Sequence, residues 1–272
     1  MTDDRTSDDA HDRLRRIVDE GAQIVGGASG PALGLLSGDP ALGVVLGGTG
    51  AAAASALRHI GQEFVDRFLG PRERKRVGAV IAVIADDLHA KLSSDEPLRD
   101  DAFFDPGLRG RSDGDEVAES VLLKCQREPE EKKVPYMGHF FANVAFRPDI
   151  SALMAHQLAK HAEQLTYRQF CLLNLATYQQ SHHRLRSEDY RGQKNFTVEL
   201  LQVLYELLDL YNRGFINFGG EVAFGPTDVK PGSMRTQGLG SHLAVLLDVS
   251  GIPDDDLTPI VAQLSVPSDS AT

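Results

Sequence analysis

Residues 22–57 read AQIVGGASGPALGLLSGDPALGVVLGGTGAAAASAL, and Asp39 is their only charged residue. Ten of the 26 glycines of this 272-residue chain fall between Gly21 and Gly50. Glycines at positions 26, 30, 34 and 38 recur at every fourth residue, a step that places them along one face of an α-helix. This spacing predicts a helix whose backbone another helix can approach closely.

A second arm with the same spacing follows the turn signal Ser37-Gly38-Asp39-Pro40. Such stripes of small residues are most useful in lipid, whereas in water each interior glycine costs about 1 kcal/mol of helix propensity relative to alanine. We therefore predict a glycine-zipper helical hairpin over residues 22–57. Its predicted interface residues are Gly26, Gly30, Gly34, Gly38, Gly43, Gly47 and Ala51.

Basic residues flank this hairpin on both sides. They are Arg13, Arg15 and Arg16 before it and Arg58, Arg67, Arg72, Arg74, Lys75 and Arg76 after it. Positive charge near both ends predicts that both ends lie on the cytoplasmic side of a membrane. Each arm would be roughly 25 Å long, which is short of a hydrocarbon core of roughly 30 Å. Two interpretations stay open: insertion into a membrane, or close helix packing within a soluble oligomer.

The rest of the chain is predicted to be mainly α-helical. Its N-terminus lacks the basic and then apolar order of a signal peptide, so we expect a cytoplasmic start. The predicted divisions are an acidic disordered tail (1–12), an N-terminal helical unit (13–92), a linker rich in Pro, Gly and Asp (93–115), a helical bundle (116–195), a winged-helix-like unit (196–265) and a tail (266–272).

The winged-helix-like prediction comes from the order helix, hairpin, helix. A helix over Thr197–Asn212 is followed by Phe215–Phe218 and Val222–Phe224 around the turn Gly219-Gly220, and then by a last helix over Thr236–Val249. From residue 196 to 272 there are three basic residues against ten acidic ones, a net charge of −7. This balance argues against nucleic-acid binding and favours a protein partner.

The sequence indicates no catalytic or metal-binding residues. Cys125 and Cys171 belong to no CxxC pair, which predicts buried free thiols, and the histidines lack acidic neighbours at metal-ligand spacing. His182-His183 lies in a basic stretch that suits either an anion contact or a solvated loop. Ser241-His242 near Asp248 lacks the surroundings of a hydrolytic nucleophile.

One segment leaves a nucleotide-dependent enzyme open as the third alternative. Val44–Gly50 looks like the first turn of a dinucleotide-binding fold. Asp86, however, follows Gly47 by 39 residues, where about 20 are expected, and no Gly-Lys-Ser/Thr phosphate loop is present. We therefore expect no cofactor.

Four segments occur in a familiar order: Glu130-Glu131-Lys132-Lys133, Gly138–Asn143, Leu165-Thr166-Tyr167 and Leu204–Ile216. Together with Thr236-Gln237-Gly238-Leu239-Gly240 they resemble the abortive-infection alpha type of bacterial protein over about residues 115–250. The resemblance implies a role in phage defence and supplies no catalytic residues. The chain departs from that pattern by carrying the glycine-rich hairpin ahead of the shared region.

These observations predict a non-enzymatic, membrane-associating helical effector or sensor on the cytoplasmic side. We expect it to form a homo-oligomer. Residues 22–57 would contact lipid or a second copy of the chain, and the C-terminal unit would bind a protein partner. The main alternative is a soluble cytoplasmic oligomer that acts as an interaction or regulatory protein through its winged-helix-like module.

Overall fold

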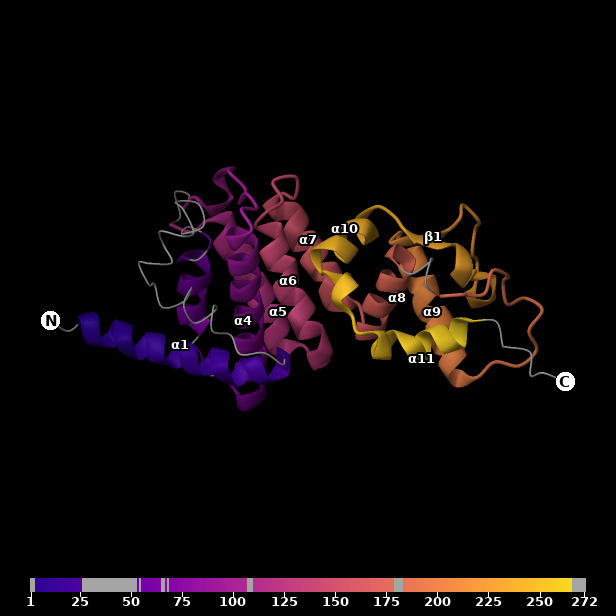
Figure 1. The fold of residues 1–272 in the computed structure, drawn as a ribbon, viewed down its shortest axis with the longest axis horizontal. Coiled ribbons are helices and arrows are strands. Elements are labelled where there is room, and N and C mark those ends of the chain that lie inside the picture. Colours follow the sequence, from indigo (N-terminus) through magenta and orange to yellow (C-terminus); the bar gives the residue numbers. More distant parts are fainter. Residues whose placement is uncertain are drawn as a thin grey trace. The chain divides into compact units, whose positions relative to one another are not determined.

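The computed structural model describes residues 3–25, 53, 55–64, 67, 69–106, 110–178 and 183–265. The chain divides into two compact units, Met1–Gln164 and Leu165–Thr272. As predicted, the described residues are mainly helical, with one small two-stranded antiparallel sheet (Figure 1).

Unit 1 is a bundle of helices around a central helix, α4. Its elements are α1 (Asp3–Val25), a helix over residues 55–64, α4 (Pro71–Ser93), η1 (Ala102–Phe104), α5 (Asp113–Arg127), η2 (Glu131–Lys133), α6 (Val134–Val144) and α7 (Ala152–Gln164). The apolar run of α4 is buried without a gap from Val77 to Ala85. Because this helix is apolar on every side there, it packs against α1, α5 and α6 together (Figure 1).

Two predicted boundaries differ from the observed ones in this unit. α1 begins at Asp3, so helix replaces much of the predicted disordered tail over 1–12. The predicted linker over 93–115 lies within unit 1, and the chain divides at Leu165 instead. Two residues tie this segment to unit 1. Phe103 is buried, and Ser112 caps α5 by accepting a hydrogen bond from the N–H of Asp115.

Unit 2 combines helices with the small sheet. Its elements are α8 (Tyr167–Thr177), α9 (Val198–Asn212), β1 (Ile216–Phe218), η4 (Pro226–Asp228), η5 (Pro231–Ser233), β2 (Met234–Thr236), α10 (Leu239–Leu246), η6 (Val249–Gly251) and α11 (Asp254–Leu264). β1 pairs antiparallel with β2, with Asn217 opposite Arg235. Thr166 and Thr197 cap α8 and α9 through their side-chain oxygens.

The sheet differs from the predicted hairpin in its second strand. The turn at Gly219-Gly220 is present, with φ of 67° and 87°, but β1 pairs with Met234–Thr236 and meets the following segment only in an isolated bridge to Glu221. The predicted strand Val222–Phe224 is held elsewhere because the backbone N–H of Phe224 donates to Asp228 at 2.8 Å. Two loop turns, η4 and η5, therefore separate the strands.

Candidate functional site

The predicted zipper residues lie outside the described part of the chain. Gly26, Gly30, Gly34, Gly38, Gly43, Gly47 and Ala51 are all in this group. The two segments that flank them, α1 and the helix over 55–64, belong to unit 1 and are described.

α1 crosses α4 at two glycines. A Cβ added to Gly78 would lie 1.8 Å from the carbonyl oxygen of Ile17, and a Cβ added to Gly21 would lie 2.0 Å from the backbone nitrogen of Ala79. Since real Cβ atoms never approach other atoms so closely, the two helix backbones can touch here only because both residues are glycine. This contact fixes the position of α1 on the bundle.

A groove with a basic rim lies beside this crossing. It has a volume of about 320 Å³ and is lined by Arg13, Arg16, Ile17, Glu20, Arg67, Leu69 and Arg74. The four arginines are exposed, whereas Ile17 and Leu69 are buried. We call this site the arginine groove. It combines basic residues that precede the glycine-rich segment with basic residues that follow it.

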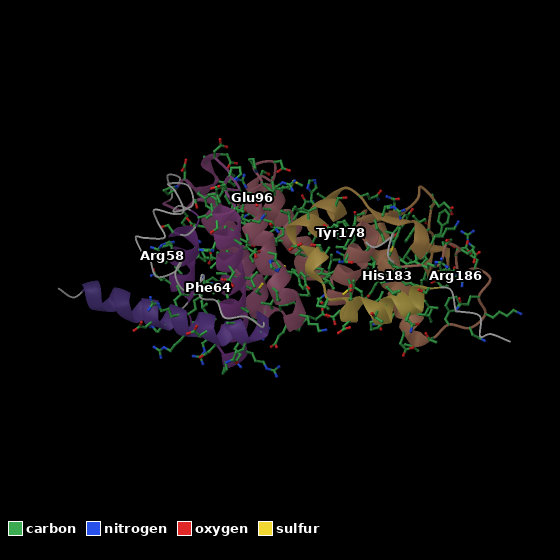
Figure 2. All side chains as sticks on the ribbon, viewed as in Figure 1. Arg58, Phe64, Glu96, Tyr178, His183 and Arg186 are labelled. Atoms are coloured by element: carbon green, nitrogen blue, oxygen red, sulfur yellow. The ribbon has the colours of Figure 1, made fainter. Side chains whose placement is uncertain are left out.

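Arg67 is held in a fixed position on the groove wall. Its guanidinium lies 4.2 Å from the ring centroid of Phe64, which is labelled in Figure 2, and it donates to Glu119 of α5 at 2.5 Å. Arg111 pairs with the same carboxylate at 2.9 Å. Burial would raise the pKa of Glu119, but the hydrogen bonds from the two arginines outweigh this effect and the pKa is lowered.

Arg74 and Arg16 are less constrained than Arg67. Among the described residues, Arg16 donates only to the carbonyl oxygen of Asp12, at 3.4 Å, and the Arg74 side chain forms no hydrogen bond or ion pair. Glu20 is the single carboxylate of the lining. The groove therefore presents more positive charge than its own residues neutralise.

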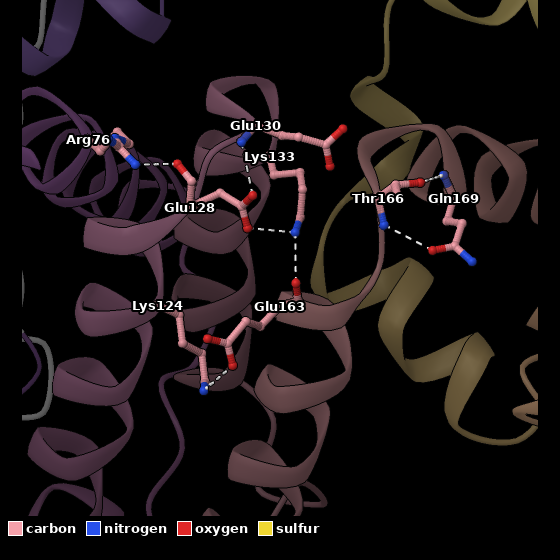
Figure 3. A network of polar contacts seen from close by, with 8 residues as sticks. All are labelled: Arg76, Lys124, Glu128, Glu130, Lys133, Glu163, Thr166 and Gln169. Carbon is pink, nitrogen blue, oxygen red and sulfur yellow. Dashed lines mark hydrogen bonds and ion pairs between the residues drawn. The ribbon is translucent and has the colours of Figure 1, made fainter. Parts of the chain in front are cut away.

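The other flanking cations do not enter the groove. Arg76 donates to the backbone carbonyl of Glu128 (Figure 3), while Arg15, Arg72 and Lys75 are exposed to solvent. The sequence predicts basic flanks but not which of these side chains meet. The signal that was missed is Gly78, a lone glycine in the apolar run of α4, since its contact with α1 brings the two flanks together.

Figure 3 shows a second polar cluster, which the sequence does not predict to be buried. The ammonium of Lys133 donates to Glu128 at 2.6 Å and to the carbonyl of Glu163 at 3.0 Å, and its side chain is 2% exposed. Glu128 also accepts from the N–H of Glu130. The cluster joins the ends of α5 and α7 to the start of α6, so it serves the packing of the bundle.

The basic stretch after α8 is used within its own loop. Arg186, labelled in Figure 2, lies 4.6 Å from the ring centroid of Tyr190 and donates to the carbonyl of Asp189 at 2.9 Å. Arg191 pairs with Asp228 at 2.7 Å, and this hydrogen bond lowers the pKa of Asp228. His182 lies outside the described residues. These contacts fit a structural loop better than an anion site.

Neither catalytic nor metal chemistry is favoured by the remaining candidates. Cys125 and Cys171 are free and buried, and burial raises the pKa of Cys125 far above its ordinary value, which keeps the thiol protonated. Asp248 accepts a hydrogen bond from Ser250. Over the ranges that the structure describes, no cluster of three or more His, Cys, Asp or Glu residues could hold a metal ion.

Comparison with protein-family models, with curated proteins and with solved structures finds no match to this chain. A search of the described helices for a long apolar segment finds none that could cross a membrane.

Proposed function

We propose that this protein is a non-enzymatic effector or sensor that associates with anionic membranes and assembles through residues 22–57. The arginine groove is the observation that carries this proposal. It gathers Arg13 and Arg16 from before the glycine-rich segment and Arg67 and Arg74 from after it, on one surface of unit 1. Clusters of exposed basic residues are attracted to anionic lipid surfaces, at about 1 kcal/mol for each Lys or Arg near the surface.

The negative net charge of the whole chain gives this basic surface a role in orienting the protein. With 28 basic and 39 acidic residues the chain carries a formal charge of −11, which would repel an anionic membrane if it were spread evenly. A basic surface on an acidic protein would orient the chain, because unit 1 would face the lipid. The glycine-rich segment would then meet the bilayer or a second copy of the chain.

The proposed biological setting is phage defence. It rests on the resemblance of residues 115–250 to the abortive-infection alpha type of protein. The coarse order of α9, a two-stranded sheet and α10 is compatible with the winged-helix-like module of that resemblance. In this proposal unit 2 recognises a trigger or protein partner, and residues 22–57 respond by insertion and oligomer formation.

The experiment replaces two zipper glycines in the full chain, as Gly30→Leu with Gly34→Leu. Flotation with anionic liposomes and the oligomer mass by light scattering should both fall, because leucine would keep the helices apart. The matched control is Gly192→Leu with Gly251→Leu, where an added Cβ meets no atom within 4 Å. If the zipper variant floats and assembles like the control, residues 22–57 do not act as proposed.

A soluble interaction protein is the second candidate, and one observation favours it. Phe224 is 87% exposed and Val222 is 59% exposed on the loop between β1 and β2. Large exposed apolar side chains of this kind are typical of contact sites for protein partners. Detergent-free fractionation distinguishes the candidates, since a soluble protein would stay in the supernatant with or without anionic lipid.

A further inference from the structure

We propose that the arginine groove binds a phosphate-bearing lipid headgroup that carries two or more negative charges. This inference rests on the proposed function and deepens it, because it names the ligand chemistry of the membrane-facing surface. It follows from the size of the groove, the number of its charges, the state of each guanidinium and the character of its floor.

The size of the groove suits a headgroup. Pockets for small molecules have volumes upward of about 300 Å³, and the arginine groove measures about 320 Å³. Such a volume accepts a phosphate with its glycerol or another small polar group, but not the acyl chains of the lipid. The chains would remain in the bilayer while the headgroup enters the groove.

The charges of the lining favour a multiply charged phosphate. Four arginines face Glu20 in the lining and Glu119, which is paired with Arg67 on the groove wall, so the formal net charge of the site is +2. A phosphodiester carries one negative charge, whereas a phosphomonoester carries about −1.5 to −2 near neutral pH. A headgroup with a terminal phosphomonoester, or with two phosphates, therefore balances the lining better than a single diester does.

The guanidiniums differ in a way that suits capture of a phosphate. Phe64 and Glu119 fix Arg67, so it offers a preset donor whose position costs little entropy on binding. Arg74 has no partner among the described residues and Arg16 has one weak backbone contact, so both can turn toward a ligand. Phosphate oxygens accept the paired N–H groups of arginine in this manner.

The remaining lining residues favour a lipid over free phosphate. Ile17 and Leu69 form an apolar floor that would contact the carbon atoms of a headgroup and would give inorganic phosphate nothing. This apolar floor therefore points to an ester rather than to the free ion.

The first arm of the test uses full-length protein and vesicles of phosphatidylcholine mixed with phosphatidic acid or with phosphatidylglycerol, adjusted to equal surface charge. We expect wild-type protein to float several-fold better with phosphatidic acid. Arg16→Gln with Arg74→Gln should lose this preference. The matched control, Arg72→Gln with Lys75→Gln, removes two exposed charges from the same surface region outside the groove and should keep it.

The second arm measures binding without a membrane, by calorimetry with the soluble short-chain lipid dibutyryl phosphatidic acid and with inorganic phosphate. We expect the groove variant to bind the short-chain lipid about 10-fold more weakly or worse, and the control to bind within about 2-fold of wild type. Inorganic phosphate should bind wild type more weakly than the short-chain lipid. Circular dichroism and melting curves should match for all three proteins, since these arginines are exposed.

The two arms separate the inference from the proposed function. Groove-dependent binding of the short-chain lipid without flotation would support the headgroup site and contradict membrane association. Flotation with equal preference for both anionic lipids, unchanged in the groove variant, would overturn the headgroup site and leave membrane association standing. Equal or tighter binding of inorganic phosphate would also overturn it, since the groove would then be a site for free anions.

Discussion

Two groups of arginines in this protein look alike in the sequence but differ in how far other residues of the chain already bind them. In unit 1 the arginine groove exposes Arg16 and Arg74 with little or no neutralisation by described residues. In unit 2 the stretch after α8 uses Arg186 to cover Tyr190 and Arg191 to bind Asp228. One set of cations is available to a ligand, and the other holds a loop in place.

The difference teaches that the number of basic residues does not identify an anion site. What matters is whether each guanidinium already has a partner within its own unit. In unit 2 Arg191 is paired with Asp228 of η4 and with Asp189 of its own loop, and Arg186 donates to the backbone carbonyls of Glu188 and Asp189. In unit 1 Glu119 performs this role for Arg67, while the contacts of the Arg16 and Arg74 side chains with described residues include no carboxylate.

The largest effect should come from removing the contact that creates the groove. Gly78→Ala places a methyl group 1.8 Å from the carbonyl oxygen of Ile17, so α1 must move away from α4. We expect a loss of more than about 3 kcal/mol in unfolding free energy, measured by urea titration, together with loss of phosphate-lipid binding. Gly192→Ala is the control, since its new methyl group meets nothing within 4 Å. A stable Gly78→Ala variant that still binds would show that the groove forms without the glycine crossing.

The fold is predictable from the sequence wherever local chemistry decides it. Threonine is a preferred N-cap residue, and the hydroxyl of Thr166 accepts from the N–H of Gln169 at 3.1 Å. The helix predicted over Thr197–Asn212 is observed as α9, with Thr197 as its cap. Both depend on residues within one helical turn of each other.

Pairings between distant segments are not predictable in the same way. The strand that follows Gly219-Gly220 is displaced because Asp228 binds the backbone of Phe224 and Gly225, a loop contact without a sequence period. The sequence also does not predict α11, which contains Pro259. The arginine groove is predictable only in part for the same reason. The sequence shows that basic residues flank the glycine-rich segment. It does not show that the two flanks come together, because this depends on Gly21 in α1 and Gly78 in α4.

The buried cation Lys133 is a charge whose contacts serve the packing of unit 1. Lys133→Met should destabilise unit 1 by about 3 kcal/mol, because Glu128 would stay buried without its partner. Adding Glu128→Leu should recover most of this loss, since a well-packed apolar pair removes both charges. Urea midpoints of the single and double variants measure the recovery, with exposed Lys132→Met as the control. No recovery in the double variant would mean that the backbone contacts of Glu128 and Lys133 matter more than their charges.

A smaller effect should separate the two arginine-rich segments directly. Arg186→Gln removes a contact with the Tyr190 ring and a hydrogen bond to Asp189, so we expect a loss of about 1 kcal/mol in unfolding free energy. Binding of short-chain phosphatidic acid should be unchanged. Arg74→Gln should do the reverse, with unchanged stability and weaker binding. If both variants behaved alike in both assays, the contrast between the two segments would be wrong.

The smallest effect concerns Glu119, whose pKa is lowered from the ordinary 4.5 by Arg67 and Arg111 despite partial burial. A carboxyl with a lowered folded-state pKa stabilises the fold above its unfolded pKa, and this contribution is lost as the pH falls through the folded value. The urea midpoint of the wild-type protein should therefore drop between about pH 6 and about pH 3.5, and the midpoint of Glu119→Gln should drop less over the same range.

The control is Glu116→Gln, on the same helix but outside this ion cluster. Its urea midpoint should fall as steeply as that of the wild type. Protonation of Glu119 also removes the ion pair that it forms with Arg67, so the groove should gain positive charge as unit 1 loses stability. An identical pH profile for wild type and Glu119→Gln would show that Phe64 and the backbone, rather than this carboxylate, hold Arg67 on the groove wall.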